Sequence, residues 1–344
     1  MQDYQSMKKR YHFSSGITDF YFDGDIRQLD AIVANRKAVI ITDENVHLLL
    51  AKKLKKFSVI AIPAGEAFKT QSTADSIINQ LIELNADRQT LLIGIGGGVV
   101  TDITGYVASV YMRGISFGFI PSSVLAMVDA AIGGKNGIDV GVYKNMVGLI
   151  RQPEFLLYDF SLLKSLPEKE WINGFAEIIK HACIQDASMF RLLEESNLSK
   201  ISRDKQLLRK LIQRNAKIKI ATVVADEFET GDRRLLNFGH TLAHAIETKY
   251  ELSHGQAVAI GMVAACKISE SLNGFRYTDR VITVIEQYGL PSAMDFNREQ
   301  VFEILKMDKK KLKNDMRYIV LEKIGRAKVQ HIPIGELHQL INQL

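Results

Sequence analysis

The first half of the chain alternates short apolar, β-branched runs with segments of helical periodicity, and this alternation constrains the fold more than any other feature. The runs end in turn residues, which is typical of buried parallel strands. Between two of them, residues 73–84 place Ile77, Leu81 and Leu84 at helical spacing. Strands that alternate with helices predict a doubly wound α/β sheet. The predicted strands are 38–42, 59–62, 91–95 and 117–120.

The length of 344 residues suits two domains, each with its own core. After Pro167 the pattern becomes helical. We therefore expect a Rossmann-like α/β domain over residues 1–160 and a mostly α-helical domain over residues 161–344. Helices are predicted at 171–184, 207–220 and 235–249.

Composition excludes several classes of protein. Hydrophobic residues make up 47% and charged residues 24% of the chain, and no apolar run reaches the length that spans a bilayer. No apolar signal core follows the N-terminus, so a cytoplasmic location is the default expectation. Cys183 and Cys266 alone predict no disulfide framework. The net charge of +5 favours anionic ligands, but the basic residues are scattered apart from 306–313, so neither a nucleic-acid nor a membrane partner is expected.

Polar and glycine residues follow the predicted strands, where a doubly wound sheet binds its ligands. The strongest feature is the triplet Gly96 to Gly98, since glycines let the backbone approach a pyrophosphate and the next helix offers unpaired amides. This favours a dinucleotide site. The triplet departs from the Gly-x-Gly-x-x-Gly pattern, so a tight structural turn is the alternative. Other residues at strand ends are Asp43, Glu66, Lys69, Ser122 and Ser123.

Two lysines mark a further segment. Lys135 and Lys144 lie nine residues apart, each beside glycine or asparagine, in a stretch with few other charges. Single lysines are usually solvated surface residues. This pair fits a pocket for anionic groups better than a solvated face.

Three of the eight histidines cluster at His240, His244 and His254. The first two are four residues apart, so on a helix both imidazoles share one face. Imidazoles with a carboxylate suit a divalent transition metal such as catalytic zinc, and the carboxylate has to come from elsewhere in the chain. The alternative is a pair of histidines partnered in a polar cleft.

Taken together, the motifs resemble those of the 3-dehydroquinate synthase family of sugar-phosphate cyclases, and the resemblance covers nearly the whole chain. Those that match in order are Gly65-Glu66-x-x-Lys69, Gly96-Gly97-Gly98-Val99-Val100-x-Asp102, Tyr111-Met112-Arg113-Gly114, Gly133-Gly134-Lys135, Lys144-Asn145, Ala176-Glu177-Ile178-Ile179-Lys180, Asp226-Glu227, Leu236-Asn237-Phe238-Gly239-His240-Thr241, His244-Ala245-Ile246-Glu247, His254-Gly255 and Asp308-Lys309-Lys310.

The resemblance implies an NAD-binding first domain, with metal and substrate between it and the second. It assigns zinc, or cobalt, to Glu177, His240 and His254, and it turns His244 towards substrate instead of metal. A homodimer is expected, in which Arg113 serves the neighbouring site as well. The implied cofactor residues are Asp43, Glu66, Lys69, Gly97, Gly98, Val99, Asp102, Ser122, Ser123, Lys135 and Lys144. The implied substrate residues are Lys135, Lys144, Asn145, Lys180, Lys219, Arg233, Asn237, His244, Arg113, Lys309 and Lys310.

The reaction implied by the resemblance converts 3-deoxy-D-arabino-heptulosonate 7-phosphate to 3-dehydroquinate and phosphate, with NAD used catalytically. Three alternatives stay open: another sugar-phosphate cyclase, a metal-dependent polyol dehydrogenase of related fold, and a silent cofactor-binding protein. Arg233 and Asn237 match family positions that contact the acidic substrate. They therefore favour the heptulosonate phosphate reaction over the three alternatives.

The chain departs from the family pattern at a few positions. Asp139, where the family has asparagine, adds a negative charge near Lys135 and Lys144, so substrate affinity is the property that it puts in question. The other departures keep size or polarity for the most part. They are Thr101 for glycine, Ser122 and Ser123 for threonines, Asn136 for threonine, Ala243 for glycine and Gln256 for glutamate.

Overall fold

The computed structural model describes residues 8–141, 143–308 and 315–344. The chain divides into two compact units. The first consists of Met1–Pro167 with Lys219–Glu227, and the second of Glu168–Ile218 with Phe228–Leu344. Residues 161–167 and 219–227 therefore group with the first unit, although the sequence assigned them to the second domain.

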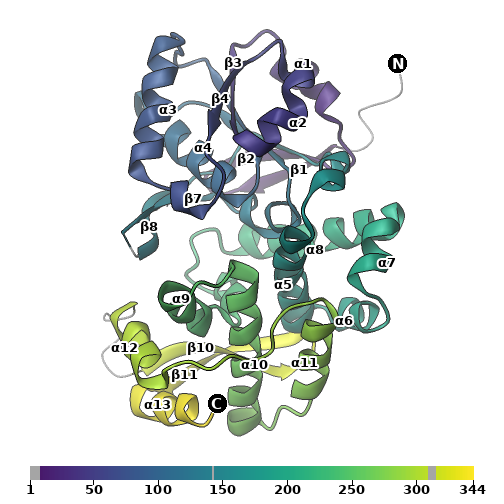
Figure 1. The fold of residues 1–344 in the computed structure, drawn as a ribbon, viewed down its shortest axis with the longest axis vertical. Coiled ribbons are helices and arrows are strands. Elements are labelled where there is room, and N and C mark those ends of the chain that lie inside the picture. The colour runs from purple at the N-terminus through teal and green to yellow at the C-terminus, as the bar shows by residue number, and fades with distance from the viewer. Residues whose placement is uncertain (1–7, 142, 309–314) are drawn as a thin grey trace. The chain divides into compact units, whose positions relative to one another are not determined.

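The first unit is built on a seven-stranded sheet of order β1-β2-β9-β6-β5-β3-β4, in which β1 and β2 are antiparallel and the other pairs are parallel (Figure 1). All four predicted strands belong to its parallel part. From β3 the chain goes to one edge for β4 and then returns to the other side of β3 for β5. The order therefore reverses between β3 and β5, where such sheets bind ligands. The strands are β1 (Lys8–Phe13), β2 (Gly16–Tyr21), β3 (Ala38–Asp43), β4 (Ser58–Ile62), β5 (Leu91–Gly96), β6 (Phe117–Pro121) and β9 (Phe155–Leu157).

Strand burial follows from the helices that cover the sheet. Successive side chains of a strand point to opposite faces, and both faces of β3 and β5 are buried. Ile40 and Ile93 belong to one core cluster with Leu50 and Leu54 of α2, while α3 and α4 also pack on the sheet. This explains why these strands read as continuous apolar runs. The helices are α1 (Leu29–Val33), α2 (Glu44–Leu54), α3 (Gln71–Glu83) and α4 (Gly98–Val110).

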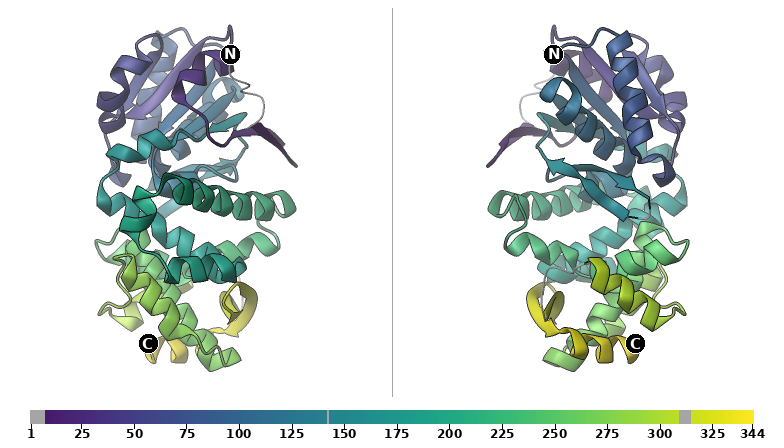
Figure 2. Two further views of the ribbon diagram at one scale, coloured as in Figure 1. Left: turned by 90° about the vertical axis from the view of Figure 1, so that its right-hand side faces the viewer. Right: turned by 90° about the vertical axis from the view of Figure 1, so that its left-hand side faces the viewer.

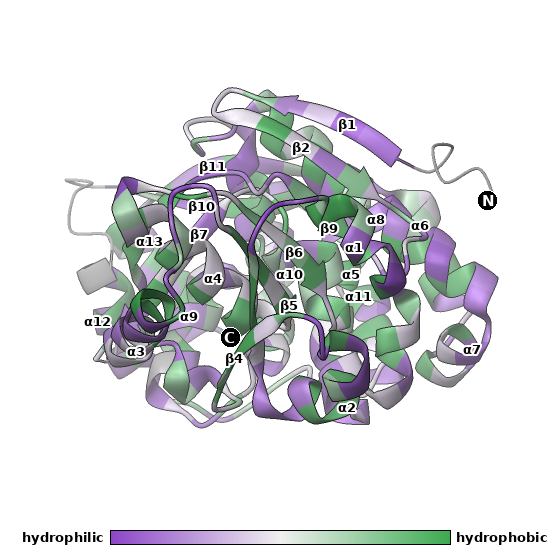
Figure 3. Ribbon diagram, turned by 90° about the horizontal axis from the view of Figure 1, so that it is seen from above, coloured by the Kyte–Doolittle hydropathy of each residue, from purple (hydrophilic) through white to green (hydrophobic). Residues whose placement is uncertain are grey.

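The edge strand β1 is different in character. Its Lys8, Lys9 and Arg10 give it the hydrophilic colour seen in Figure 3, and Arg10 pairs with Asp19 of β2 at 2.8 Å. Charged residues on an edge strand discourage pairing with other chains.

A hairpin that the sequence did not predict follows β6. Strand β7 (Lys135–Val140) pairs antiparallel with β8 (Tyr143–Ile150), and β7 packs on α4. The hairpin carries Lys135 on β7 and Lys144 and Asn145 on β8, so these residues lie on the strands of a two-stranded sheet.

The second unit is mostly helical, as predicted, but it also contains an unpredicted hairpin of β10 (Asp315–Lys323) and β11 (Arg326–Pro333). This hairpin packs on α5 and α10 (Figure 2, yellow strands). Phe175 of α5 stacks on Tyr288 at 4.9 Å between ring centroids within this core. The helices are α5 (Glu168–Gln185), α6 (Ala187–Glu194), α7 (Leu198–Arg203), α8 (Lys205–Ala225, assigned to this unit as far as Ile218), α9 (His240–Lys249), α10 (His254–Asn273), α11 (Thr278–Gln287), α12 (Arg298–Asp308) and α13 (Ile334–Asn342).

The helix predicted over 235–249 was wrong at its start. A 3-10 turn spans Asp232–Asn237, Gly239 adopts the left-handed conformation, and α9 begins at His240. Among the described helices, none combines the length and the apolar character that crossing a membrane would need.

Candidate active site

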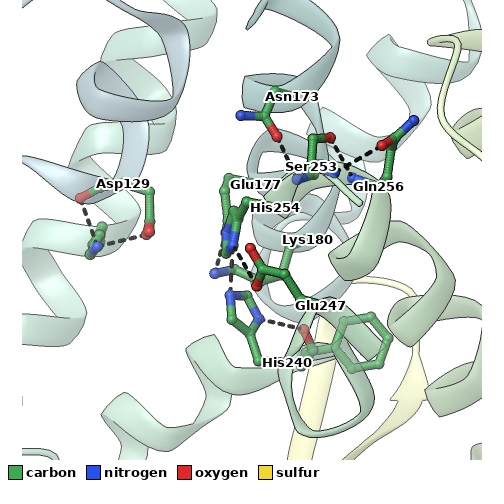
Figure 4. Close-up of polar contacts among 12 residues, drawn as sticks. Asp129, Asn173, Glu177, Lys180, His240, Glu247, Ser253, His254 and Gln256 are labelled. Carbon is green, nitrogen blue, oxygen red and sulfur yellow. Dashed lines mark hydrogen bonds and ion pairs between the residues drawn. The ribbon is translucent and has the colours of Figure 1, made fainter. Parts of the chain in front are cut away.

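Three possible metal ligands from three helices of the second unit converge. Glu177 lies in the middle of α5, while His240 and His254 are the first residues of α9 and α10. Glu177 Oε1 is 3.3 Å from His240 Nε2 and 3.0 Å from His254 Nε2 (Figure 4). Each residue offers one ligand atom, and these atoms all lie within 4.8 Å of one another.

Glycines allow α9 and α10 to approach closely enough for this convergence. Gly239 precedes His240 and has a φ of 80°, a conformation that residues other than glycine rarely adopt. A Cβ at Gly239 would lie 2.8 Å from the Met262 nitrogen of α10, and one at Gly261 would overlap the Gly239 carbonyl oxygen. The two backbones therefore touch where α9 begins.

Capping and hydrogen bonds fix the start of α10. Ser253 and Gln256 form a capping box. The Ser253 hydroxyl accepts from the backbone N–H of Gln256, and the side-chain oxygen of Gln256 accepts from the backbone N–H of Ser253. The Gly255 N–H donates to Asn173 Oδ1 of α5 at 2.5 Å. Both contacts, drawn in Figure 4, hold His254 beside α5. Gln256, a departure from the family pattern, thus has a structural function at the helix start.

The buried carboxylate of Glu177 is neutralised from within its own helix. Its side chain has no exposed surface, and the Lys180 ammonium, one turn later, forms an ion pair with it. Burial opposes ionisation, but Lys180 and His240 outweigh it and hold the Glu177 pKa well below its usual range. Glu177 is therefore an anionic ligand.

The two histidines differ in their protonation. Burial and the nearby Lys180 charge lower the pKa of His240, and its Nδ1 lies 3.2 Å from the Phe238 carbonyl oxygen, which fixes its ring. For His254, burial opposes the charge, but contacts to Glu177 and Glu247 outweigh it and raise the pKa to about 10. Without a metal, His254 is the protonated member of the set.

This donor set fits a divalent transition metal. One carboxylate and two imidazoles, with ligand atoms within 4.8 Å of one another, match a catalytic zinc or cobalt site that keeps an open position. The exposed His244, one turn after His240, is not part of this group, although the two rings lie edge to face at 5.5 Å. Two residues that support the ligands were not predicted as site residues: Glu247, which lies beside His254, and Asn173, which accepts from the Gly255 N–H. Glu247 belongs to the motif that begins at His244, whereas no motif contains Asn173.

Two other predicted substrate residues of the second unit lie on the turn before α9. Arg233 is buried, with 2% exposure, and Asn237 donates to Glu229 Oε1 at 2.5 Å. Lys180 is buried on α5. Lys309 and Lys310 lie outside the described residues.

In the first unit, the glycine triplet forms the turn from β5 into α4. Gly97 is the extended N-cap of α4, and its helix begins at Gly98. The Thr101 hydroxyl, where the family has glycine, donates to the Gly98 carbonyl oxygen at 2.9 Å and so uses its polar group within the helix. The first turn of α4 is therefore regular although Thr101 carries a side chain there.

The neighbouring loops contribute hydroxyl and carboxylate groups. The Ser122 N–H donates to the Gly96 carbonyl oxygen at 2.8 Å, and the Ser123 hydroxyl accepts from the Ala126 N–H at 3.2 Å. Asp43 accepts from the Val46 N–H at 2.9 Å and caps α2. Asp43 is thus the last residue of β3 and Gly97 follows β5, and these two strands flank the reversal of the sheet.

Lys69 is the centre of a second charged cluster. Its Nζ is 2.5 Å from Asp102 Oδ2, 2.6 Å from Asn145 Oδ1 and 4.0 Å from Glu66 Oε1, and only 4% of the residue is exposed. Burial opposes its charge, but the carboxylates of Asp102 and Glu66 outweigh it and raise the Lys69 pKa above its ordinary value. The structure thus brings together four residues that the sequence assigned to cofactor and substrate.

Lys219 has a partner that the predicted site did not include. Its Nζ lies 2.6 Å from Asp129 Oδ1 and 2.7 Å from the Asp129 carbonyl oxygen (Figure 4). Asp129 lies on a π-helical turn, Ala126–Ala130, and such turns are frequent at functional sites.

The remaining predicted residues are more open. Lys135 is exposed at the start of β7, Lys144 is partly exposed on β8, and Val99 is partly exposed in the first turn of α4. Arg113 is exposed and has a φ of 68°, in a turn that Met112 enters with a φ of 49°.

Comparison with known proteins shows the family of the chain. Residues 59–173 match the model of the 3-dehydroquinate synthase N-terminal region, and residues 174–311 match that of the C-terminal region. A 3-dehydroquinate synthase of Pyrococcus abyssi is 40% identical over 288 residues, which cover 83% of this chain and 85% of that protein.

Solved structures show the same fold. A 2-deoxy-scyllo-inosose synthase complexed with carbaglucose-6-phosphate, NAD+ and Co2+ has a TM-score of 0.86 at 22% identity, covering 98% of this chain and 99% of that one. A 2-epi-5-epi-valiolone synthase of Streptomyces hygroscopicus with NAD+ and Zn2+ also has a TM-score of 0.86, at 24% identity, covering 97% of each chain. The two family models together span most of the chain, and with the Pyrococcus relative they show that the protein belongs to the 3-dehydroquinate synthase family.

Proposed function

We propose that this protein converts 3-deoxy-D-arabino-heptulosonate 7-phosphate to 3-dehydroquinate and inorganic phosphate, in the shikimate pathway to the aromatic amino acids. Membership of the family supports the proposal. The observation that carries it is the convergence of Glu177, His240 and His254 beside the buried Lys180. A metal-ligand set next to a buried cation suits a substrate that carries both hydroxyl groups and negative charge.

The proposed cofactors are NAD and a divalent metal, zinc or cobalt. The solved structures of similar fold that contain NAD+ with Co2+ or Zn2+ support this choice, as does the donor set of this chain. When bound, NAD would supply a reversible hydride acceptor and the metal a Lewis acid. The residues that would hold the metal are Glu177, His240 and His254. Those that would hold NAD are Asp43, Glu66, Lys69, Gly97, Gly98, Val99, Asp102, Ser122, Ser123, Lys135 and Lys144.

The charged side chains have to balance the substrate. A carboxylate and a phosphate carry nearly three negative charges, whose burial has to be offset by positioned cations. Arg233 is suited to the carboxylate because a buried guanidinium presents a planar pair of donors. The other proposed substrate residues are Lys135, Lys144, Asn145, Lys180, Lys219, Asn237, His244 and Arg113, with Lys309 and Lys310.

These residues bind and orient the substrate, and the lysines stabilise charge. The substrate's own phosphate group would accept the proton that is lost during elimination, so no side chain is assigned as a strong base. Since phosphate leaves without net oxidation, the enzyme would be a carbon–oxygen lyase.

Two further properties are part of the proposal. We place the enzyme in the cytoplasm and expect a homodimer, in which the exposed Arg113 reaches the neighbouring site. Light scattering at working concentration measures the dimer directly, and a strictly monomeric mass would exclude it.

The decisive experiment supplies purified protein with NAD, zinc and the heptulosonate phosphate, and follows phosphate release and NADH absorbance together. We expect stoichiometric release of phosphate with no accumulation of NADH. A second sugar phosphate without a carboxylate should react poorly, because it would not offer the Arg233 guanidinium a carboxylate to bind. Accumulation of NADH with a polyol would instead identify a dehydrogenase, and absence of phosphate release would refute the assignment.

A further inference from the structure

The β7–β8 hairpin is irregular at the position opposite Asp139. Ile138 pairs with Val147, and Val140 pairs with Tyr143, so Asp139 alone faces residues 144–146 of β8. Asn145, in the middle of this bulge, has a φ of 56°. Bulges next to active sites redirect a side chain, and the redirected residue needs support outside the ladder.

Asp139 provides that support through a closed ring of three hydrogen bonds. The Asn145 N–H donates to Asp139 Oδ1 at 2.8 Å, and the Asp139 N–H donates to the Lys69 carbonyl oxygen at 2.7 Å. Lys69 Nζ closes the ring by donating to Asn145 Oδ1 at 2.6 Å. The ring joins the hairpin to the segment after β4, where Thr70 and Asp139 also form a bridge.

We propose that Asp139 is a positioning residue of the cofactor site: its carboxylate holds Asn145 in the left-handed conformation, so that the Asn145 amide and Asp102 fix the Lys69 ammonium between them. The inference rests on the proposed function, since it assigns Asp139 to the site that would hold NAD. The sequence indicated only an electrostatic effect of Asp139 on Lys135 and Lys144. In this proposal the Asp139 carboxylate also acts as a hydrogen-bond acceptor for the Asn145 N–H.

Two substitutions separate these effects. Asp139→Asn keeps an oxygen that can accept from the Asn145 N–H but removes the charge, whereas Asp139→Ala removes both. Asp87→Ala is the matched control, because Asp87 also accepts a backbone N–H, that of Gln89 at 2.9 Å, in a turn of the same unit.

Three measurements are made on each full-length protein: hydrogen exchange of the peptide containing Asn145, the Kd for NAD by calorimetry without substrate, and steady-state kinetics. Asp139→Ala should expose the Asn145 amide to exchange and weaken NAD binding about five- to tenfold, the effect of one ordinary hydrogen bond. Asp139→Asn should retain protection and bind NAD within about twofold of wild type. Asp87→Ala should match wild type in NAD binding.

The outcomes distinguish this inference from the proposed function. If Asp139→Ala binds NAD as wild type does, or if Asp139→Asn loses as much affinity as Asp139→Ala, the positioning function is overturned. A wild-type protein that binds NAD but releases no phosphate refutes the proposed reaction and leaves the Asp139 comparison readable through NAD affinity and exchange. A wild-type protein that does not bind NAD overturns both.

Discussion

Glu177 Oε1 and His254 Nε2 lie 3.0 Å apart although 77 positions separate the two residues in the sequence. With His240, they come from α5, α9 and α10, so the donor set exists only when these three helices are packed. Metal binding is therefore coupled to folding of the second unit, because the unfolded chain has no preformed site.

Substitution of the ligands should separate metal binding from substrate binding. His240→Ala and His254→Ala should each lose stoichiometric zinc. Residues that only support a metal ligand contribute up to about a hundredfold in metal affinity, so loss of a ligand itself should lower the zinc affinity by more than that. His244→Ala should keep its zinc because its imidazole is not in the donor group. Metal content after dialysis, measured by mass spectrometry, gives the comparison. A zinc-free His244→Ala protein beside a zinc-replete His254→Ala protein would reverse the assignment.

Removal of the Lys180 charge should affect the metal-free protein more than the metal-bound protein. Lys180 and Glu177 form an ion pair in which both residues are almost fully buried. Lys180→Met leaves the Glu177 carboxylate without that partner, which costs about 3–5 kcal/mol for a buried pair. A bound cation would replace part of the lost charge.

Urea unfolding with and without zinc tests this expectation. The loss of unfolding free energy should be at least about 1 kcal/mol smaller with saturating zinc, in line with the lower cost of a carboxylate that keeps one cationic partner. An equal loss in both conditions would show that the Lys180 charge and a bound metal do not stabilise the same Glu177 carboxylate.

The sheet could be predicted from sequence because its strands are buried on both faces. Burial of β3 and β5 produces continuous apolar runs, and turn residues mark their ends. The hairpin β7–β8 could not be found in this way. It contains four glycines or asparagines within residues 136–145 and is exposed along much of β8, so no regular alternation appears.

The start of α9 shows a second limit of sequence reasoning. The sequence predicted a helix from residue 235, but Gly239 has a φ of 80° and leaves no room for a Cβ against α10. His240 therefore becomes the first residue of its helix. Spacing within the sequence suggested that His240 and His244 shared a metal, and only the resemblance pointed to Glu177, since a carboxylate on another helix leaves no local pattern.

Stability at acidic pH should depend on Glu227. Its carboxylate accepts from the Ser15 N–H at 3.0 Å, the Ser15 hydroxyl at 2.5 Å and Gln152 Nε2 at 2.8 Å. Burial opposes its ionisation, but these hydrogen bonds outweigh it and lower the Glu227 pKa below its ordinary value. A lowered folded-state pKa contributes stability above the unfolded-state pKa, and this contribution is lost as pH falls through the folded-state value.

Glu227→Gln should therefore reduce the unfolding free energy at pH 7 and lose less additional stability than wild type between about pH 5 and 3, the range in which a carboxylate titrates. Chemical unfolding across this pH range measures the difference. If the two proteins lost stability in parallel as the pH fell, the hydrogen bonds to Ser15 and Gln152 would not favour the ionised form.

Zinc binding should release close to one proton per site near neutral pH. Glu177 is already ionised because its pKa is lowered, and the lowered pKa of His240 leaves that ring neutral, whereas the pKa of His254 is raised to about 10. Only His254 has to lose a proton to coordinate a metal. Between about pH 7 and 9 the affinity should therefore rise by about a factor of ten per pH unit, as expected when one proton is displaced. Calorimetry in buffers of different ionisation enthalpy counts the released protons, and a value near zero or two would show that the charge state of the three ligands differs from the one derived from their contacts.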